Sequence, residues 1–176
     1  LFRSGSDGIG MHEMIIHPFE PVFDGNSRIL ILGTMPSPKS REKLFYYGHP
    51  QNRFWRILPE LFGESPLLSN EEKTAFLLQH HIALWDVLAS CEIKGADDAS
   101  IRQSVPNDLM RVIAAAPISA VFTNGQKASA LYKRYFGQNI MLPQYCLPST
   151  SPANCRNWTT ETLREAWKVI LEYLED

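Results

Sequence analysis

Side chains that could do chemistry are concentrated in three polar segments of the chain. The first covers residues 33–52 and ends at Asn52, the second begins at Asn124, and the third spans residues 148–154. An asparagine amide is a poor proton acceptor, but its carbonyl can orient a water molecule, and the whole amide can pair with the polar edge of a ligand. Hydroxyls and backbone N–H groups, which fill the third segment, can hold anionic oxygen atoms. These residue types suit a site that binds a polar ligand and positions water.

Each polar segment follows a short apolar run that is typical of a buried strand. These runs are residues 28–33, 118–123 and 145–147. A fourth run, residues 82–88, is predicted to be a strand that ends in a turn. Residues 33–51 have no helical period and are predicted to form one long functional loop. The predicted helices are residues 52–62, 69–80 (with a capping box), 106–115, 126–136, and a final one with an apolar stripe at 163–174.

This alternation of strands and helices predicts an α/β fold, a three-layer α/β/α domain with a central, mainly parallel sheet. In such folds a ligand binds beyond the carboxyl ends of the strands, so the three polar segments should meet at one site. We expect a single domain over residues 11–176. Residues 1–10 are rich in Gly and Ser, and we interpret them as a cloning remnant or a disordered leader.

The bulk composition limits the possible partners. The formal net charge is −2 and the isoelectric point is about 6.2, so any contact with nucleic acid must come from a local basic patch. The three cysteines are an odd number without a CxxC pair, which indicates free thiols in a reducing, intracellular compartment. No apolar run approaches the ~20 residues that span a membrane. Neither a metal nor an organic cofactor is implied, nor an obligate protein partner.

Four motifs give the chain a family resemblance. They are Gly33-Thr34-Met35-Pro36-Ser37, Tyr46-Tyr47-Gly48, His49-Pro50-Gln51-Asn52-Arg53-Phe54-Trp55, and Leu147-Pro148-Ser149-Thr150-Ser151-Pro152-Ala153-Asn154. From residue 28 to the C-terminus the chain resembles the uracil-DNA glycosylase superfamily, and within it the hypoxanthine-DNA glycosylase branch. Met35 stands where the mismatch-specific uracil enzymes have their catalytic Asn, and Leu147 replaces the His of the classical uracil enzymes.

The resemblance implies a monofunctional DNA glycosylase of base-excision repair. Such an enzyme flips a deaminated base, here hypoxanthine and also uracil, out of double-stranded DNA and hydrolyses its N-glycosidic bond. The reaction passes through an oxocarbenium-like state, which needs a positioned water on one side and stabilisation of the leaving base on the other. The resemblance assigns the catalytic position to Asn52, which would orient the water. The alternative for Asn52 is a cap on the helix that it begins.

Several residues are predicted to bind the flipped base, each with a structural alternative. Tyr47 would stack on the base, or else pack in the core; Asn124 would pair with the base edge, or else serve an Asn-Gly turn. His49 would donate a hydrogen bond, or else be structural. Met35 would form an apolar wall. The predicted base-binding set is Gly33, Thr34, Met35, Pro36, Tyr47, His49 and Asn124.

The predicted DNA-binding set comes from the first and third segments. Its members are Ser37, Lys39, Ser40, Ser149, Thr150, Ser151 and Arg156. Basic residues cluster between residues 39 and 56 against one acid, Glu42, which predicts either a phosphate-facing patch or a solvated surface. The side chain that fills the gap left by the flipped base is expected within residues 154–156, but no single residue is identified.

Asp86 is the one carboxylate that the sequence places near the site, and a buried partner or cap is favoured over a general base. Two other functions compete with a glycosylase. The first is a catalytically inactive DNA- or nucleotide-binding module on the same fold, suggested by Met35. The second is an acyl hydrolase using a loop serine, but the chain lacks a Gly-x-Ser-x-Gly motif and a recognisable His partner.

Overall fold

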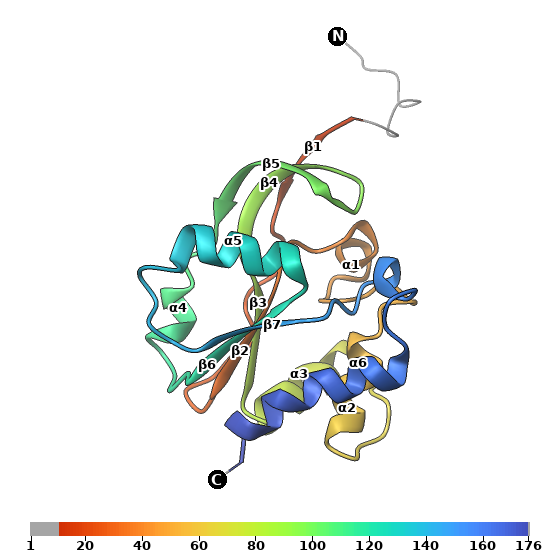
Figure 1. The fold of residues 1–176 in the computed structure, drawn as a ribbon, viewed down its shortest axis with the longest axis vertical. Helices are drawn as coiled ribbons and strands as arrows, with labels where there is room; N and C mark the ends of the chain where they lie inside the picture. The colour runs from red at the N-terminus through yellow and green to blue at the C-terminus, as the bar shows by residue number, and fades with distance from the viewer. Residues whose placement is uncertain (1–10, 176) are drawn as a thin grey trace.

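The computed structural model describes residues 11–175, and a four-stranded parallel sheet lies at its centre (Figure 1). The strand order is β3-β2-β6-β7, with β3 at Ile82–Asp86, β2 at Ile29–Gly33, β6 at Ala120–Asn124 and β7 at Gln144–Leu147. In the register, Gly33 lies opposite Asp86 and Asn124 lies opposite Leu147. The carboxyl ends of all four strands therefore meet at one edge, where the polar segments begin.

Helices cover both faces of this sheet. They are α1 (Pro38–Lys43), α2 (Phe54–Leu61), α3 (Asn70–Gln79), α4 (Met110–Ile113), α5 (Gln126–Phe136) and α6 (Thr160–Trp167), with 3-10 helices at Pro152–Asn154 and Lys168–Tyr173. Figure 1 shows α2, α3 and α6 on one side of the sheet and α4 and α5 on the other. The predicted three-layer α/β/α class is thus confirmed. Among residues 11–175, no helix has both the length and the apolar character needed to cross a membrane.

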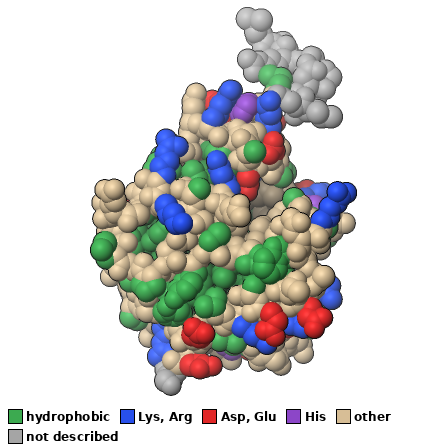
Figure 2. All heavy atoms as spheres, viewed as in Figure 1, with side chains coloured by type: hydrophobic (Ala, Val, Ile, Leu, Met, Phe, Trp, Pro, Cys, Tyr) green, Lys and Arg blue, Asp and Glu red, His purple; other side chains and the backbone are tan. Residues whose placement is uncertain are grey.

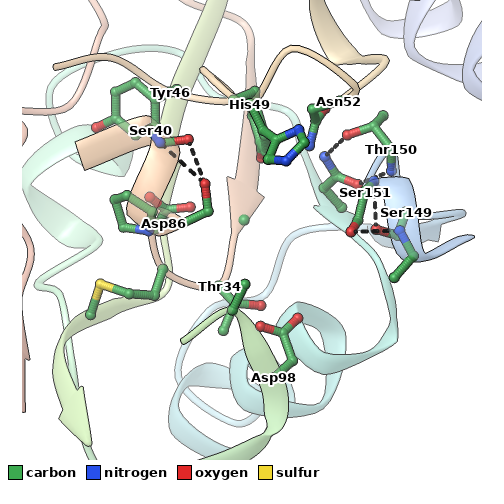
Figure 3. A pocket seen from close by; sticks show the side chains of 18 of the residues that line it. Thr34, Ser40, Tyr46, His49, Asn52, Asp86, Asp98, Ser149, Thr150 and Ser151 are labelled. Atoms are coloured by element: carbon green, nitrogen blue, oxygen red, sulfur yellow. Dashed lines mark hydrogen bonds between the residues drawn. The ribbon is translucent and has the colours of Figure 1, made fainter. Parts of the chain in front are cut away.

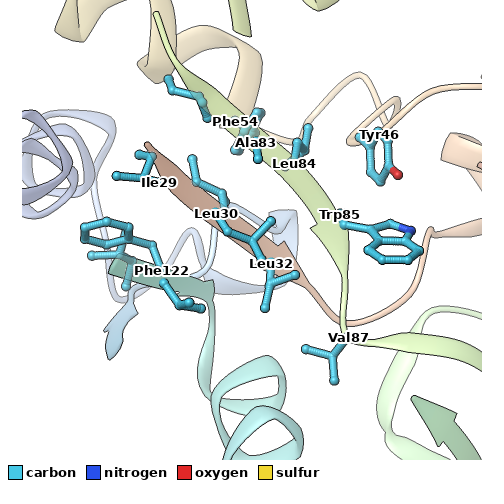
Figure 4. Packing of buried hydrophobic residues seen from close by; sticks show 14 of the residues in the cluster. Ile29, Leu30, Leu32, Tyr46, Phe54, Ala83, Leu84, Trp85, Val87 and Phe122 are labelled. Atoms are coloured by element: carbon cyan, nitrogen blue, oxygen red, sulfur yellow. The ribbon is translucent and has the colours of Figure 1, made fainter. Parts of the chain in front are cut away.

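The central strands are apolar along their whole length because both of their faces are covered. Every residue of β2, β3 and β6 is buried, and residues 29–32 have no exposed surface. Phe54 from α2 and Phe122 from β6 are also fully buried in this cluster (Figure 4). Burying one such side chain contributes ~1.5–3 kcal/mol, so the strand positions are strongly determined.

A second, antiparallel sheet is the largest difference from the sequence prediction. It has the order β1-β4-β5, with β1 at Glu13–Ile16, β4 at Leu88–Lys94 and β5 at Asp97–Pro106. The expected turn after residue 88 is wrong, because the chain continues from β3 into β4 almost without a break. β5 is mostly exposed and pairs with β4 through three register shifts, so its sequence carries no apolar alternation to indicate a strand.

Three smaller differences have local causes. The predicted long loop contains the short helix α1, because Ser37 caps it by accepting the Ser40 N–H and Pro38 suits its first position. The predicted helix 106–115 is reduced to α4, because Pro106 ends β5 and Asn107 is bonded through its backbone and side chain to the carbonyls of residues 86–88. The C-terminal helix continues as a 3-10 helix after Trp167. The interpretation of residues 1–10 as a remnant or leader lies outside the described residues.

Candidate active site

A cavity of about 310 Å³ opens at the carboxyl edge of the parallel sheet. All three polar segments line it, as their positions after β2, β6 and β7 predicted. The predicted site residues on its wall are Gly33, Thr34, Met35, Pro36, Ser37, Ser40, Tyr47, His49, Asn52, Asn124, Ser149, Thr150 and Ser151. Figure 3 shows Asn52 and His49 on one side of this space and Asp86 and Ser40 on another.

Two residues of the predicted DNA-binding set do not line the cavity. Lys39 is exposed on α1 and forms an ion pair with Glu42 at 3.3 Å. Arg156 is exposed just beyond the 3-10 helix Pro152–Asn154. Both cations lie outside the cavity itself, and Glu42 already partly neutralises Lys39.

Asp86, the last residue of β3, is a buried carboxylate. One of its oxygens is hydrogen-bonded to a histidine, and the other lies beside the cavity. Oδ2 accepts a 2.7 Å hydrogen bond from His17 Nε2, and both side chains are almost fully buried. The Phe19 N–H donates to His17 Nδ1 at 3.1 Å, which assigns the ring proton to Nε2. The other oxygen, Oδ1, lies next to Gly33, where an added Cβ would approach it to 2.4 Å. Only glycine fits opposite this carboxylate.

Tyr47 has a left-handed backbone, with φ of 54°, and stacks on Phe54 with ring centroids 4.2 Å apart. It also lines the cavity, so core packing and a cavity-facing role coexist. Its hydroxyl is buried beside Gly33 and near the Asn124 amide, without a well-directed hydrogen bond to any residue in 11–175. Burial first, and then the charge of Asp86, raises the pKa of Tyr47 far above its ordinary value. The hydroxyl is therefore neutral.

Asn124, the last residue of β6, uses both ends of its amide on Thr150. Its Oδ1 accepts the Thr150 N–H at 3.0 Å, and its Nδ2 donates to Thr150 Oγ1 at 3.0 Å. The Thr150 carbonyl in turn accepts the Arg53 N–H at 3.1 Å. Thr150, in the third polar segment, is thereby bonded to Asn124 in the second segment and to Arg53, the residue that follows the first segment.

Asn52 lines the cavity and lies two residues before Phe54, where α2 begins, so the predicted helix start at residue 52 is wrong and Arg53 occupies the N-cap position. Its Oδ1 accepts the Phe54 N–H at 3.0 Å, which satisfies a donor in the first turn of the helix. This bond leaves the Nδ2 group and a second lone pair of Oδ1 for a water or a ligand. His49 accepts the Gln51 N–H on Nδ1 at 3.0 Å, so its Nε2 carries the proton and can donate.

The serines of the first segment hold the loop in place. Ser40 is buried, and its hydroxyl oxygen accepts the Gly48 N–H at 2.9 Å and the Ser37 hydroxyl at 3.1 Å. Met35 packs against the hydrophobic core while lining the cavity, in keeping with an apolar wall. The loop is thus organised by its own hydrogen bonds before any ligand binds.

The antiparallel sheet supplies a wall that sequence reasoning missed. Ile93, Gly95, Ala96 and Asp98 from the β4–β5 hairpin line the cavity. Asp86 is therefore not the only carboxylate there. Asp98 keeps exposed surface, but partial burial of its carboxyl raises its pKa, and the charge of Asp86 adds to this. In the sequence, the glycine and the two aspartates within residues 95–98 are turn-forming residues that could have indicated the tip of this hairpin. The part of the chain that the structure describes contains no cluster of His, Cys, Asp and Glu that could hold a metal.

Residues 20–175 match the family described as the uracil DNA glycosylase superfamily. The chain belongs to this superfamily. It is accordingly a DNA glycosylase, a hydrolase that cuts the N-glycosidic bond between a base and its deoxyribose. The match covers the whole parallel sheet and every segment that lines the cavity.

Relatives with names and structures agree with this assignment. A hypoxanthine DNA glycosylase of Methanosarcina acetivorans is 32% identical over 162 residues, covering 91% of this chain and 100% of the relative. One from Methanosarcina barkeri is 37% identical over 112 residues, covering 62% of this chain and 71% of the relative. The solution NMR structure of a Methanosarcina acetivorans protein, provisionally named a uracil DNA glycosylase, superposes with a TM-score of 0.78 at 31% identity. It covers 93% of this chain and 100% of that one.

Proposed function

We propose that this glycosylase excises hypoxanthine in preference to uracil from double-stranded DNA. The observation that carries the proposal is the cavity itself, which holds an amide, Asn52, apart from a buried carboxylate, Asp86, around space for one base. Its volume of about 310 Å³ lies at the small end of the ~300–1,000 Å³ typical of ligand sites. The names of the two Methanosarcina relatives support the same substrate.

Asp86 is the group that would recognise a deaminated base. Deamination of adenine converts ring nitrogen N1 from a hydrogen-bond acceptor into an N–H donor beside a new carbonyl. The free oxygen Oδ1 of Asp86 accepts hydrogen bonds only, and the proton on His17 Nε2 keeps the carboxylate in its acceptor form. A hypoxanthine N–H suits that oxygen, whereas the N1 lone pair of intact adenine is repelled by it.

Activity on uracil is expected to be weaker, and the reason lies in the apolar residues Met35 and Leu147 and not in Asp86. Met35 and Leu147 are apolar where other branches of the superfamily have polar groups, and both are buried or packed against the core. Met35 lines the cavity and gives it an apolar wall that suits a larger ring, whereas Leu147 lines only a neighbouring hollow. Tyr47 would stack on the base, and His49 would donate from Nε2 to a base or phosphate oxygen.

Asn52 would hold the attacking water. Its amide is fixed at the start of α2 by the bond to the Phe54 N–H, so it projects from a rigid element. A neutral amide can hold water against the anomeric carbon without adding charge there.

An intracellular location follows from a DNA substrate and fits the free cysteines Cys91, Cys146 and Cys155.

The test is single-turnover cleavage of duplexes that carry deoxyinosine or deoxyuridine, followed by alkali to break abasic sites. We expect faster cleavage at deoxyinosine; a clearly higher rate at deoxyuridine would overturn the preference. Binding to lesion DNA without alkali-labile sites would instead support a catalytically inactive module.

Asn52→Ala separates catalysis from helix capping. We expect it to bind lesion DNA nearly as well as the parent and cut it at least ~100-fold more slowly, because the amide acts mainly in the transition state. Asn52→Ser is the matched control, since serine caps helices well but is too short to hold the same water. Loss of the cap alone costs ~1 kcal/mol of stability. A serine variant that restores both stability and rate would make Asn52 a cap only.

A further inference from the structure

A second hollow lies beside the cavity and shares Tyr47, His49 and Asn52 with it. It is a groove of about 830 Å³ between the end of α1, helix α2 and the start of α3. Three cations, Lys43, Arg56 and Lys73, line it, and we call it the cation groove. Figure 2 shows charged side chains of both signs on the visible face, in keeping with a net charge of −2. In such a protein, a groove lined by three cations is a local departure from the overall charge.

The cations of this groove are left without carboxylate partners. None of the three forms an ion pair with any residue in the described range 11–175. The two glutamates that also line the groove are engaged with groups that do not line it: Glu60 pairs with Arg164 at 2.6 Å, and Glu64 pairs with His80. Burial, and then the charge of Lys43, lowers the pKa of Lys73, as expected for cations held close together. An anion would relieve this repulsion.

The walls of the cation groove suit a nucleotide strand. Phe45 and Trp55 lie along it with their rings 5.9 Å apart, and the Lys73 ammonium sits 5.4 Å from the Trp55 ring centroid. Trp55 is only 8% exposed and supports the Lys73 ammonium, while the partly exposed Phe45 ring adds an aromatic surface beside the row of cations, a combination found in sites that follow a nucleotide strand.

The opposite side of the cavity has the reverse character. There a third hollow adjoins the cavity, and the two have common lining residues: Ala96, Asp98, Ser149, Ser151 and Ala153. Asp97 and Asp98 are its only charged lining residues within the described chain. A phosphodiester backbone on the hairpin side faces Asp97 and Asp98, whose charge Lys127 partly offsets, whereas on the side of α2 and α3 it faces three cations.

We propose that the cation groove holds the sugar–phosphate backbone on one side of the flipped nucleotide, with Lys43, Arg56 and Lys73 contacting its phosphates. The proposal rests on the proposed function, since it takes the base in the cavity as the starting point of the strand. It assigns the flanking phosphates to cations that lie next to the cavity, whereas Lys39 is partly neutralised by Glu42.

The experiment pairs charge variants with DNA in which phosphates on one flank of a deoxyinosine are replaced by neutral methylphosphonates. Lys43→Gln/Arg56→Gln removes two exposed cations of the groove, and Lys73→Gln is measured separately because Lys73 also packs on Trp55. The matched control is Lys133→Gln/Arg134→Gln, the same charge change at exposed positions in the last turn of α5, on the other side of the sheet. Binding is followed by fluorescence anisotropy over a range of salt concentrations, and folding by thermal melting.

For Lys43→Gln/Arg56→Gln we expect the salt slope to fall by about two, roughly one for each lost phosphate contact, and the control to leave it unchanged. Methylphosphonates on one flank should weaken the parent but not weaken the variant further, while those on the other flank weaken both equally. Additive losses on both flanks, or an equal effect of the control, would overturn the cation groove. The salt slope is measured from binding of deoxyinosine DNA and requires no cleavage. The groove can therefore fail while cleavage stands, and cleavage can fail while the groove stands.

Discussion

Asp86 and Asn124 occupy equivalent places in the sheet and yet differ in how much bonding capacity they retain. Each ends a strand that flanks β2, each is at most 9% exposed, and each lines the same cavity. Asp86 accepts one hydrogen bond from a side chain, that of His17, and keeps Oδ1 beside the cavity. Asn124 has both ends of its amide bonded to Thr150.

This difference separates a group available for chemistry from one that maintains the cavity. A buried carboxylate is costly unless it is hydrogen-bonded, and His17 supplies only part of what it requires. Its free oxygen is a fixed, charged acceptor that a ligand can use. The Asn124 amide is already satisfied, and its removal would first affect the loop that contains Thr150. We therefore expect substitutions at the two residues to affect different measurements.

Of the substitutions at these two residues, Asp86→Asn should have the larger effect on activity. The change keeps the volume and an acceptor for His17, but it replaces a charged acceptor with an amide. A hydrogen bond to a charged group contributes about 1.5–3 kcal/mol, which corresponds to a loss of roughly 10- to 150-fold in kcat/KM on deoxyinosine. Single-turnover rates measured against enzyme concentration test this. His17→Gln, which can still donate to Oδ2, is the control, and an Asp86→Asn enzyme as active as the parent would remove the base-reading role.

Asn124→Ala should mainly lower stability. The variant leaves the buried Thr150 N–H and hydroxyl without partners, and we expect the free energy of unfolding to fall by about 2 kcal/mol. Urea denaturation measures this directly. Thr150→Val and the double variant complete a mutant cycle, in which strong non-additivity confirms the pair. If Asn124→Ala keeps the parental stability but loses cleavage, Asn124 acts on the base and the contrast with Asp86 fails.

Alkaline pH should weaken the side of the cavity that holds Asp86. Burial raises the pKa of both Tyr46 and Tyr47 far above the ordinary 10.0, and the charge of Asp86 adds to the increase. Their contribution to stability is complete below about pH 10, where tyrosine is neutral in both states, and it is lost as pH rises and the unfolded chain ionises first. Urea denaturation as a function of pH should show this loss, and the part of the tyrosinate absorbance that a Tyr46→Phe/Tyr47→Phe variant lacks should appear only on unfolding. Ionisation of these tyrosines in the folded protein near pH 10 would contradict it.

Tyr47→Phe should have the smallest effect. The Tyr47 hydroxyl is buried without a directed partner, so its removal should leave stability unchanged or raise it by up to about 1 kcal/mol. The ring remains to stack on Phe54 and on a base, so cleavage should stay close to parental. Thermal melting and single-turnover rates check both points. A large loss of activity would show that the hydroxyl takes part in the polar wall beside Asp86.

The amino-acid sequence by itself determined the parallel sheet and the loops that follow it. The predicted strands 28–33 and 118–123 contain the continuous apolar runs 29–32 and 120–122, and such runs are typical of strands with both faces covered. Parallel strands bring their carboxyl ends to one edge, so the sequence alone predicts that the loops containing Gly33, Asn124 and Thr150 meet.

Only the tertiary structure decided which polar atoms remain free at that edge. Whether Asp86 is satisfied depends on His17, 69 residues away, and whether Asn124 is free depends on Thr150, 26 residues away. The hairpin that brings Asp98 to the cavity has an exposed, irregular strand with no apolar pattern. The local pattern of apolar residues predicts which faces of a strand or helix are buried, because side chains alternate between faces with a fixed period. The pairing of polar groups depends on long-range packing, which leaves no such period in the sequence.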